Sequence, residues 1–238
     1  EKINFIREIC SKHNVELNFL PSIESFKNDL GKLNEHSGVP LISKQYKNIS
    51  FFYRISKRIL DIAIVMIIFF ASLPFWILIP ILIKYDSKGP ILFKQKRIGL
   101  NGKPFKLYKF RSMHSDSPKY AHCPDSSSDP RITKIGKWLR KTSIDELPQI
   151  YNVLKGEMSM VGPRPEMPFI VKSYNRIEKR RLVVKPGLTG LWQVSPHRNT
   201  EINHNLEYDF YYIENQSFIL DLVILFMTAI FAVRGITH

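Results

Sequence analysis

The chain has few cysteines and lacks the short motifs that mark several large classes of enzymes. Its two cysteines, Cys10 and Cys123, lie far apart and have no partner at a metal-ligand spacing. This argues against a disulfide framework and against a thiolate metal site, and it fits a cytoplasmic protein. The sequence contains no P-loop, no GxGxxG after a strand, no HExxH and no internal repeat. The usual sequence evidence for P-loop NTPases, dinucleotide enzymes, zinc proteases and repeat proteins is therefore missing.

Acidic residues are also in deficit, because 21 Asp and Glu stand against 35 Lys and Arg and give a formal net charge of +14. So basic a chain favours anionic partners such as nucleic acid, acidic lipid headgroups or phosphorylated small molecules. Its 238 residues allow one large domain or two small ones. The chain begins with Glu1 rather than Met, which indicates a piece of a longer protein. A secretory signal cannot be judged from such a start.

The N-terminal 52 residues are predicted to form two segments. In residues 1–26, apolar side chains first recur at helical spacing and then alternate over Val15–Leu20 as in a strand. We therefore expect the last helix and strand of an upstream α/β domain. Residues 27–52 are polar and contain two glycines and a proline, which is typical of a linker.

One long apolar run, Ile62–Ile83, contains no charged residue. As a straight helix it would extend about 33 Å and could span a bilayer, so a transmembrane helix is one interpretation. Pro74 kinks a helix at this point, and Ser72 can satisfy the freed carbonyl groups. Basic residues lie at both ends, whereas a spanning helix normally has its excess on one side. These features favour a re-entrant segment, residues 53–84, that bends and leaves on the same face. The flanking basic residues are Arg54, Lys57, Arg58, Lys84, Lys88, Lys94, Lys96 and Arg97.

Residues Ile91–Met113 predict a β-hairpin that turns at Asn101-Gly102. The second strand carries Lys106, Lys109 and Arg111 with aromatic residues between them. One face of this strand must therefore pack. Interleaved aromatic and basic residues could also mark a nucleic-acid surface.

Two other segments have no strong functional signal. The polar stretch with His114, His122 and Cys123 has no recognised metal-ligand spacing, so loop residues are expected. Phe218–Val233 is apolar except for Asp221 and is short for a membrane span. It could be a core helix or a helix lying on the membrane surface.

Residues Ser143–Glu166 read SIDELPQIYNVLKGEMSMVGPRPE and contain two adjacent acids, Asp145 and Glu146. Ser143 followed by Glu146 is a capping-box pattern, which would give the acids only a structural role. Pro148 instead favours a helix that begins at Asp145 itself, because proline is tolerated in a first turn. Backbone N–H groups would then keep Asp145 ionised, and a fixed carboxylate can act as a nucleophile. Capping alone does not decide between these interpretations.

Nearby cations strengthen the catalytic interpretation. Attack by a carboxylate on a phosphate brings two anions together, so it needs Arg, Lys or Mg²⁺ to offset their repulsion. Arg140 precedes the acids, and Arg164 follows them between Pro163 and Pro165. Arginine suits bidentate phosphate contact, and Glu146 is a ligand that Mg²⁺ accepts beside substrate phosphates.

Several long motifs follow one another from Tyr53 to the end of the chain: KRILDI, DSKGPILFKQKRIG, FKLYKFRSM, DPRITKIGKWLRKTSIDELPQIYNVLKGEMSMVGPRPE, VKPGLTGLWQV and EYDFYYIENQSFILDL. With the proline-broken apolar run, they make the chain resemble the bacterial sugar transferases, which are monotopic phosphoglycosyl transferases acting on polyprenyl phosphate. The N-terminal stretch with LPSIESF looks like the end of the Rossmann-like domain of the larger members.

The resemblance implies transfer of a sugar-1-phosphate from a nucleoside diphosphate sugar, usually a UDP-sugar, to undecaprenyl phosphate. The products would be UMP and a polyprenyl-diphosphate sugar, which begins a surface glycan such as exopolysaccharide, capsule, O-antigen or a glycoprotein glycan. The family's nucleophile falls on Asp145, which would form an aspartyl-phosphosugar. Its partner falls on Glu146, which would assist and help to hold Mg²⁺, with Asp209 expected as a further metal ligand.

The resemblance also implies the other site residues. The expected phosphate-binding residues are Lys109, Arg111, Arg140, Arg164 and Arg198. Pro163 and Pro165 are expected at the nucleotide, and Ser72 and Pro74 at the membrane bend. The chain departs from the family where Ser195-Pro196-His197-Arg198 replaces the usual Gly-Arg, and where Leu73 separates Ser72 from Pro74.

The expected fold class is α+β, with a mostly helical catalytic domain over residues 85–238, the β-hairpin, the re-entrant helix and interfacial helices. The expected location is the cytoplasmic face of the bacterial inner membrane. The expected partners are a UDP-sugar, undecaprenyl phosphate and Mg²⁺, without nucleic acid, and a homodimer is left open. A non-catalytic membrane-surface module is the competing hypothesis, but it has no use for the acid pair and Arg164. The sequence does not specify the sugar.

Overall fold

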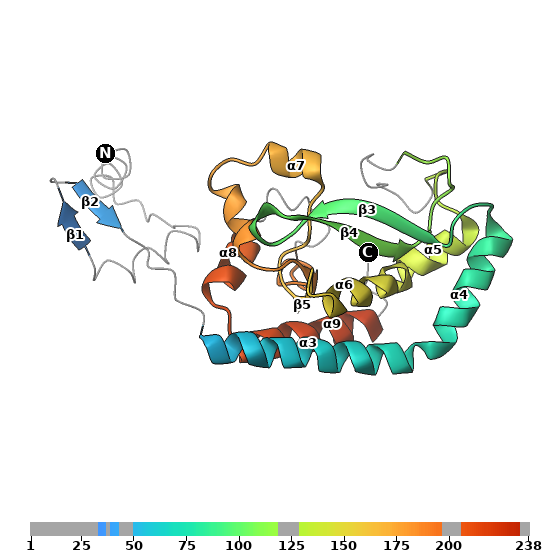
Figure 1. The fold of residues 1–238 in the computed structure, drawn as a ribbon, viewed down its shortest axis with the longest axis horizontal. Coiled ribbons are helices and arrows are strands. Elements are labelled where there is room, and N and C mark those ends of the chain that lie inside the picture. Colours follow the sequence, from blue (N-terminus) through green and yellow to red (C-terminus); the bar gives the residue numbers. More distant parts are fainter. Residues whose placement is uncertain (1–32, 37–38, 43–49, 119–128, 197–205, 234–238) are drawn as a thin grey trace, which may run out of the picture. The chain divides into compact units, whose positions relative to one another are not determined.

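The structure is a computed structural model that describes residues 33–36, 39–42, 50–118, 129–196 and 206–233 (Figure 1). The chain divides into two compact units, residues 1–48 and 49–238. In the first unit, β1 (Leu33–His36) and β2 (Val39–Ile42) form an antiparallel hairpin. The stretch predicted to be a linker therefore contains secondary structure. The α/β remnant predicted over residues 1–26 lies outside the described residues.

The second unit begins with two apolar helices, α3 (Phe51–Ala71) and α4 (Leu73–Asp86), which are bent by 63° at Ser72. Pro74 stands in the first turn of α4, so the predicted break is confirmed. Ser72 Oγ donates to the Phe69 carbonyl oxygen at 3.2 Å and accepts from Trp76 Nε1 at 3.0 Å. Among the described helices, none is long and apolar enough to cross a bilayer by itself; the bent pair passes this test only when its two helices are taken together.

The predicted β-hairpin is confirmed by β3 (Leu92–Ile98) and β4 (Pro104–Phe110), which pair antiparallel with Leu92 opposite Phe110. The short 3₁₀ turn η1 (Leu100–Gly102) joins them. Asn101 and Gly102 have φ values of 55° and 75°. Asparagine and glycine tolerate this left-handed region, which explains why their pair marks the turn.

The segment around the acid pair is helical on both sides of Thr142-Ser143. It forms α5 (Lys134–Lys141), the 3₁₀ helix η2 (Ile144–Gln149) and α6 (Ile150–Leu154). Ser143 precedes η2 with a left-handed φ of 54° and makes no side-chain capping bond. Ser143 thus occupies the N-cap position without forming the capping box, with both acids in the first turn of η2. Asp145 is the second residue of η2, so the prediction that it caps the helix is wrong. The left-handed turn at Ser143 determines where η2 begins, and no pattern in the sequence predicts this turn.

The remaining elements complete an α+β fold, as expected. They are β5 (Ser159–Val161), α7 (Pro168–Lys172), η3 (Glu178–Val183), β6 (Gly187–Thr189), α8 (Leu206–Glu214) and α9 (Phe218–Val233). Strands β5 and β6 pair in parallel. Helix α9 has the predicted bounds and lies beside α3 (Figure 1).

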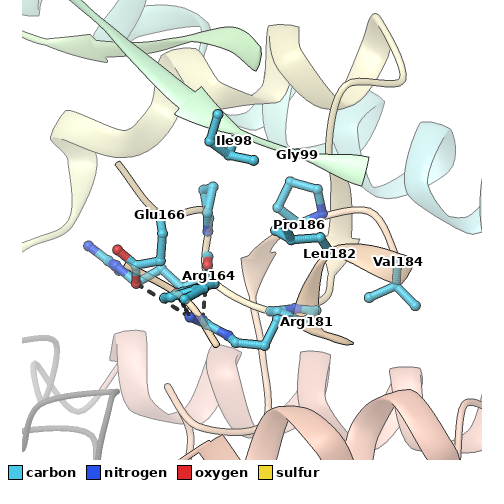
Figure 2. A pocket seen from close by; sticks show the side chains of 11 residues that line it. Ile98, Gly99, Arg164, Glu166, Arg181, Leu182, Val184 and Pro186 are labelled. Carbon is cyan, nitrogen blue, oxygen red and sulfur yellow. Dashed lines mark hydrogen bonds and ion pairs between the residues drawn. The ribbon is translucent and has the colours of Figure 1, made fainter. Parts of the chain in front are cut away.

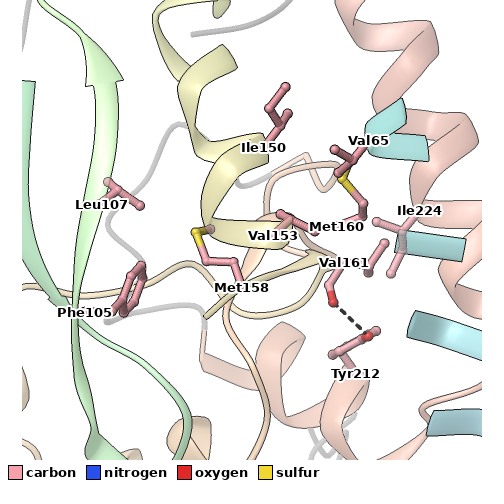
Figure 3. Packing of buried hydrophobic residues seen from close by; sticks show 10 residues of the cluster. All are labelled: Val65, Phe105, Leu107, Ile150, Val153, Met158, Met160, Val161, Tyr212 and Ile224. Carbon is pink, nitrogen blue, oxygen red and sulfur yellow. Dashed lines mark hydrogen bonds between the residues drawn. The ribbon is translucent and has the colours of Figure 1, made fainter. Parts of the chain in front are cut away.

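The main hydrophobic core joins α3 to β4, α6, β5, α8 and α9 (Figure 3). Val65 of α3 and Ile224 of α9 are fully buried there. Burial of one such side chain contributes about 1.5–3 kcal/mol. The buried members are Val65, Phe105, Leu107, Ile150, Val153, Met158, Met160, Val161, Tyr212 and Ile224. A second cluster of Ile79, Ile83, Phe110 and Leu139 holds α4.

The outer sides of α3, α4 and α9 expose many large apolar side chains. They include Phe51, Phe52, Ile59, Ile67, Phe70, Ile77, Ile81, Ile219 and Phe226. Helix α9 is therefore a core helix on the side of Ile224 and an apolar surface helix on the other. So much exposed apolar area is unusual for a protein surface in water and indicates a non-aqueous or protein partner.

Two basic residues at the start of the apolar run bind protein groups. Lys57 Nζ donates to Asp221 Oδ2 at 3.0 Å, and Arg58 donates to the carbonyl oxygens of Val153 and Leu154 at 2.7 Å each. Asp221 is fully buried in α9. These two residues of the expected basic flank therefore attach α3 to α6 and α9.

Candidate active site

The structure brings the two acids together with predicted cations from distant parts of the chain. Helix η2 packs against β4, which carries Lys109. Lys109 Nζ lies 2.6 Å from Glu146 Oε1 and 3.9 Å from Asp145 Oδ2. An Arg164 guanidinium nitrogen lies 3.8 Å from the same Glu146 oxygen. Four predicted site residues thus form one charged cluster.

Burial dominates the electrostatics of Asp145. Its side chain is 6% exposed, and removal from water raises the pKa of its carboxyl to about 6. Lys109 opposes this rise most strongly, Glu146 adds to it through like-charge repulsion, and Arg140 and Arg164 also oppose it. Side-chain cations therefore keep Asp145 charged, and not the backbone N–H groups that the sequence led us to expect. With a pKa of about 6, Asp145 is mostly ionised at pH 7.

Close backbone packing fixes the loop that carries Arg164. The Gly162 N–H donates to the Thr189 carbonyl oxygen at 2.9 Å, and the Gly187 N–H donates to that of Pro163 at 2.9 Å. A Cβ atom at Gly162 or Gly187 would overlap the backbone of the facing segment. Only glycine allows this approach, which places the two prolines and Arg164 at the end of β5.

Two other arginines hold the backbone around Arg164. Arg181 donates to the Arg164 carbonyl oxygen at 3.2 Å, and Arg97 donates to that of Pro165 at 3.1 Å. Figure 2 shows Arg181 directed at Arg164 and Glu166. The Arg164 side chain therefore leaves a backbone segment that is fixed by neighbouring charges.

Both predicted nucleotide residues, Pro163 and Pro165, line a pocket beside Arg164 (Figure 2). Leu182 and Val184 contribute to its largely apolar wall. The structure thus places the two prolines next to the cation cluster, where a substrate group attached to a phosphate could lie.

Arg140 approaches the cluster from α5. Its Nε donates to Ser112 Oγ at 3.2 Å, and a terminal nitrogen lies 3.8 Å from Met113 Sδ. Its positive charge contributes to lowering the pKa of Asp145. Within the described part of the chain it forms no ion pair with a carboxylate, so its charge remains available to an anionic ligand.

The prediction that Arg111 binds phosphate is wrong. Arg111 is 4% exposed and donates to the carbonyl oxygens of Ser87 and Lys88 at 2.7 and 2.9 Å. These carbonyl groups lie just beyond the end of α4, so Arg111 fastens this end to β4. A contact between segments so far apart in the sequence could not be read from a basic strand.

The structure also places Asp209 apart from its predicted role. Asp209 is 2% exposed, and its Oδ2 accepts from Arg181 Nε at 2.6 Å. It therefore neutralises a buried arginine. No group of three or more His, Cys, Asp or Glu side chains that could hold a metal occurs among the described residues. Arg198, the remaining predicted phosphate ligand, lies outside them.

Sequence reasoning missed three polar residues that line a pocket with Lys109, Glu146 and Arg164. They are Arg97, Gln149 and Gln193. Gln149 could have been noticed because it follows Glu146 by three residues, which is the repeat of the 3₁₀ helix that contains both. Arg97 and Gln193 carry no local signal, because they reach the pocket only through tertiary packing.

The acid pair fits Mg²⁺ by its donor set. Mg²⁺ is usually held by one or two carboxylates together with water and substrate phosphates, so a cage of three protein ligands is not required. Glu146 lines the pocket, and its buried neighbour Asp145 supplies a second carboxylate beside it. Lys109 Nζ lies 2.6 Å from Glu146 and 3.9 Å from Asp145, so one cation already approaches both. Asp209 does not fit this donor set because Arg181 occupies its carboxylate.

Together these residues define a class of site in which a carboxylate with a raised pKa lies among lysine and arginine side chains that can bind phosphate. Such a site can bind a phosphate-bearing substrate and present a nucleophile to it. Comparison with known proteins agrees with this class, because the family model described as bacterial sugar transferase matches residues 52–235. The chain belongs to the bacterial sugar transferase family.

Three curated relatives show how far the similarity extends. The galactosyl transferase CpsE of Streptococcus agalactiae is 41% identical over 83% of this chain and 46% of its own length. The UDP-glucose:undecaprenyl-phosphate glucose-1-phosphate transferase of Klebsiella pneumoniae is 36% identical over 88% and 47%. The exopolysaccharide production protein ExoY of Sinorhizobium fredii is 37% identical over 73% and 84%. The chain thus spans about half the length of the first two relatives and most of the third.

Proposed function

We propose that the protein transfers a sugar-1-phosphate from a nucleoside diphosphate sugar, with UDP as the nucleotide, to undecaprenyl phosphate. The products are UMP and an undecaprenyl-diphosphate sugar that begins a surface glycan. The names of the relatives from Klebsiella pneumoniae and from Aeromonas hydrophila support a UDP-sugar donor and an undecaprenyl-phosphate acceptor. The observation that carries the proposal is the buried Asp145 with Lys109 at 3.9 Å and Arg164 close to its neighbour Glu146.

In the first step, an oxygen of Asp145 attacks the phosphorus that bears the sugar. A bond forms between Asp145 and this phosphorus, and the bond to the UMP oxygen breaks, so UMP leaves with its electron pair. Lys109, Arg140 and Arg164 offset the repulsion between the carboxylate and the diphosphate. Glu146 holds Lys109 beside Asp145 through its 2.6 Å ion pair.

In the second step, an oxygen of undecaprenyl phosphate attacks the same phosphorus. The bond between phosphorus and Asp145 breaks, and Asp145 returns as a carboxylate. Neither step requires a proton from the protein. This agrees with the composition of the site, which contains carboxylates, lysine and arginine. No histidine among the described residues lines its pocket.

Mg²⁺ is a proposed cofactor of this reaction. Asp145 and Glu146 would hold it together with oxygens of the donor diphosphate. When bound, it supplies neutralisation of the negative charge on the diphosphate and the leaving group.

We also propose that α3 and α4 enter the cytoplasmic side of the bacterial inner membrane and return to the same face. The 63° bend at Ser72 and the exposed apolar sides of both helices support this arrangement. It would place the acid pair within reach of both a water-soluble donor and a lipid phosphate. Replacing Pro74 with Leu should restore a continuous helix and lower activity. Labelling of single cysteines before Lys57 with an impermeant reagent in intact cells would reveal a spanning segment and refute the arrangement.

The transferase proposal is tested by incubating the purified protein with Mg²⁺, a panel of UDP-sugars and undecaprenyl phosphate. We expect UMP release with at least one donor, and sustained release only when the lipid phosphate is present. Asp145→Asn serves as the inactive control because the amide keeps the shape of the side chain and cannot attack phosphorus. Binding of donors without any UMP formation would favour a non-catalytic membrane-surface module.

A further inference from the structure

Gln149 differs from the other amide side chains in the interior of the protein. It is 4% exposed, and its carboxamide has no hydrogen-bond partner in the parts of the chain that the structure describes. By contrast, the fully buried Asn152 donates to the Lys106 carbonyl oxygen at 2.7 Å and to Glu157 at 2.8 Å, and it accepts from the Tyr108 N–H at 3.2 Å. Buried polar groups are normally paired, so an unpaired amide calls for a ligand or another explanation.

The position of Gln149 indicates where that ligand would lie. Gln149 ends η2, three residues after Glu146, and residues three apart eclipse one another in a 3₁₀ helix. Both residues line one pocket, together with Lys109 and Arg164. The other amide of this pocket, Gln193, is already engaged because its Nε2 donates to the Leu188 carbonyl oxygen at 3.1 Å. Gln149 therefore adds a neutral N–H donor to a pocket that otherwise presents cations.

We infer that Gln149 is a substrate-contacting residue whose carboxamide N–H donates to a phosphate oxygen of the donor diphosphate. This inference rests on the proposed function, since it assigns one further residue to the same site. An amide donor can bind a phosphate oxygen without adding charge, so it can orient the diphosphate beside Lys109 and Arg164 without further lowering the pKa of Asp145.

The lack of a protein partner also predicts an unusual stability effect. Because the Gln149 amide makes no hydrogen bond within the described part of the chain, replacing it removes none from the fold. Methionine has nearly the same length and needs no hydrogen bond, so Gln149→Met should unfold at the same temperature as the wild-type protein or at a higher one. A residue kept for structural reasons would behave in the opposite way.

The test compares the wild-type chain, Gln149→Met, Gln149→Glu and the matched control Gln216→Met in detergent. Gln216 lies between α8 and α9 and donates to the Ile213 carbonyl oxygen at 3.2 Å, away from the pocket. Binding of UDP and of inorganic pyrophosphate is measured by calorimetry, and unfolding temperature by scanning fluorimetry. We expect Gln149→Met to bind both probes about ten-fold more weakly or worse, because a hydrogen bond to a charged group is lost. Gln149→Glu should bind them more weakly still, and Gln216→Met like the wild type.

Three outcomes would overturn the inference. Unchanged affinity of Gln149→Met for both probes would mean that the amide does not contact the diphosphate. A lower unfolding temperature of Gln149→Met would show that the role of Gln149 is structural. Failure of the wild-type protein to bind either probe would show that the pocket does not bind a diphosphate. Absence of transferase activity in a wild-type protein that binds UDP would refute the proposed function but leave the Gln149 contact standing.

Discussion

Replacing Lys109 with Gln should move the pH dependence of the reaction toward higher pH. Lys109 is the strongest of the groups that hold down the pKa of Asp145, which burial raises to about 6. At the observed separation of 3.9 Å the attraction between the charges amounts to about 4 kcal/mol for an effective dielectric constant near 20. The charge of Lys109 also interacts with Glu146, which lies closer, at 2.6 Å, so its net effect on Asp145 is smaller than this value. We therefore expect the acid limb to move up by about one to two pH units.

The assay measures initial UMP release between pH 5 and about 9 at subsaturating donor, so that the profile reports the ionisation of the free enzyme. Lys109→Gln will also be slower at every pH because it loses a phosphate contact. The position of the acid limb, and not its height, is therefore the readout. Lys106→Gln is the matched control, since Lys106 is an exposed lysine of the same strand and is not among the main groups that shift the pKa of Asp145. An acid limb in the same place for Lys109→Gln and wild type would refute the reasoning.

Three further substitutions test other parts of the account. Arg164→Lys keeps the charge but loses the planar fork, so the donor KM should rise about ten-fold while the unfolding temperature stays constant; identical donor kinetics would exclude this role. Asp145→Asn should raise the free energy of unfolding at pH 7 by up to about 3 kcal/mol, because the folded pKa is raised from 3.8 to about 6 and ionisation therefore destabilises the fold. That gain is complete above pH 6 and should vanish below pH 4, so denaturant titrations showing a loss at pH 7 would contradict it. Lys57→Met leaves Asp221 buried without its cation and should lower the free energy of unfolding by about 3–5 kcal/mol. Adding Asp221→Asn should recover part of this loss. Equal stability of Lys57→Met and the wild-type protein would show that the ion pair does not stabilise the fold.

Local chemistry accounts for the parts of the fold that the sequence predicted correctly. Asn101-Gly102 determines the hairpin turn because both residues tolerate a positive φ, and Pro74 breaks the apolar helix wherever that helix lies. The bounds Phe218–Val233 follow from hydropathy alone. These features depend on a few neighbouring residues, so they survive without knowledge of the tertiary structure.

The errors arose where a residue finds its partner far along the chain. Lys109 lies on β4 and Arg111 directly follows it, with Phe110 between them, yet one faces Glu146 and the other fastens the end of α4. Asp209 was expected to be a metal ligand and instead pairs with Arg181, a contact that no local sequence pattern predicts. The acid pair was found by its chemistry, but its pKa depends on burial, and burial is a property of the assembled fold.

The central claim is that Asp145 becomes covalently attached to the phosphosugar. The most direct measurement is mass spectrometry of the protein after incubation with Mg²⁺ and its UDP-sugar in the absence of undecaprenyl phosphate. The account predicts an added sugar-phosphate on the peptide that contains Asp145, its loss when undecaprenyl phosphate is added, and no adduct in Asp145→Asn. Turnover with UMP release but no adduct on Asp145, or an adduct that persists in Asp145→Asn, would contradict it.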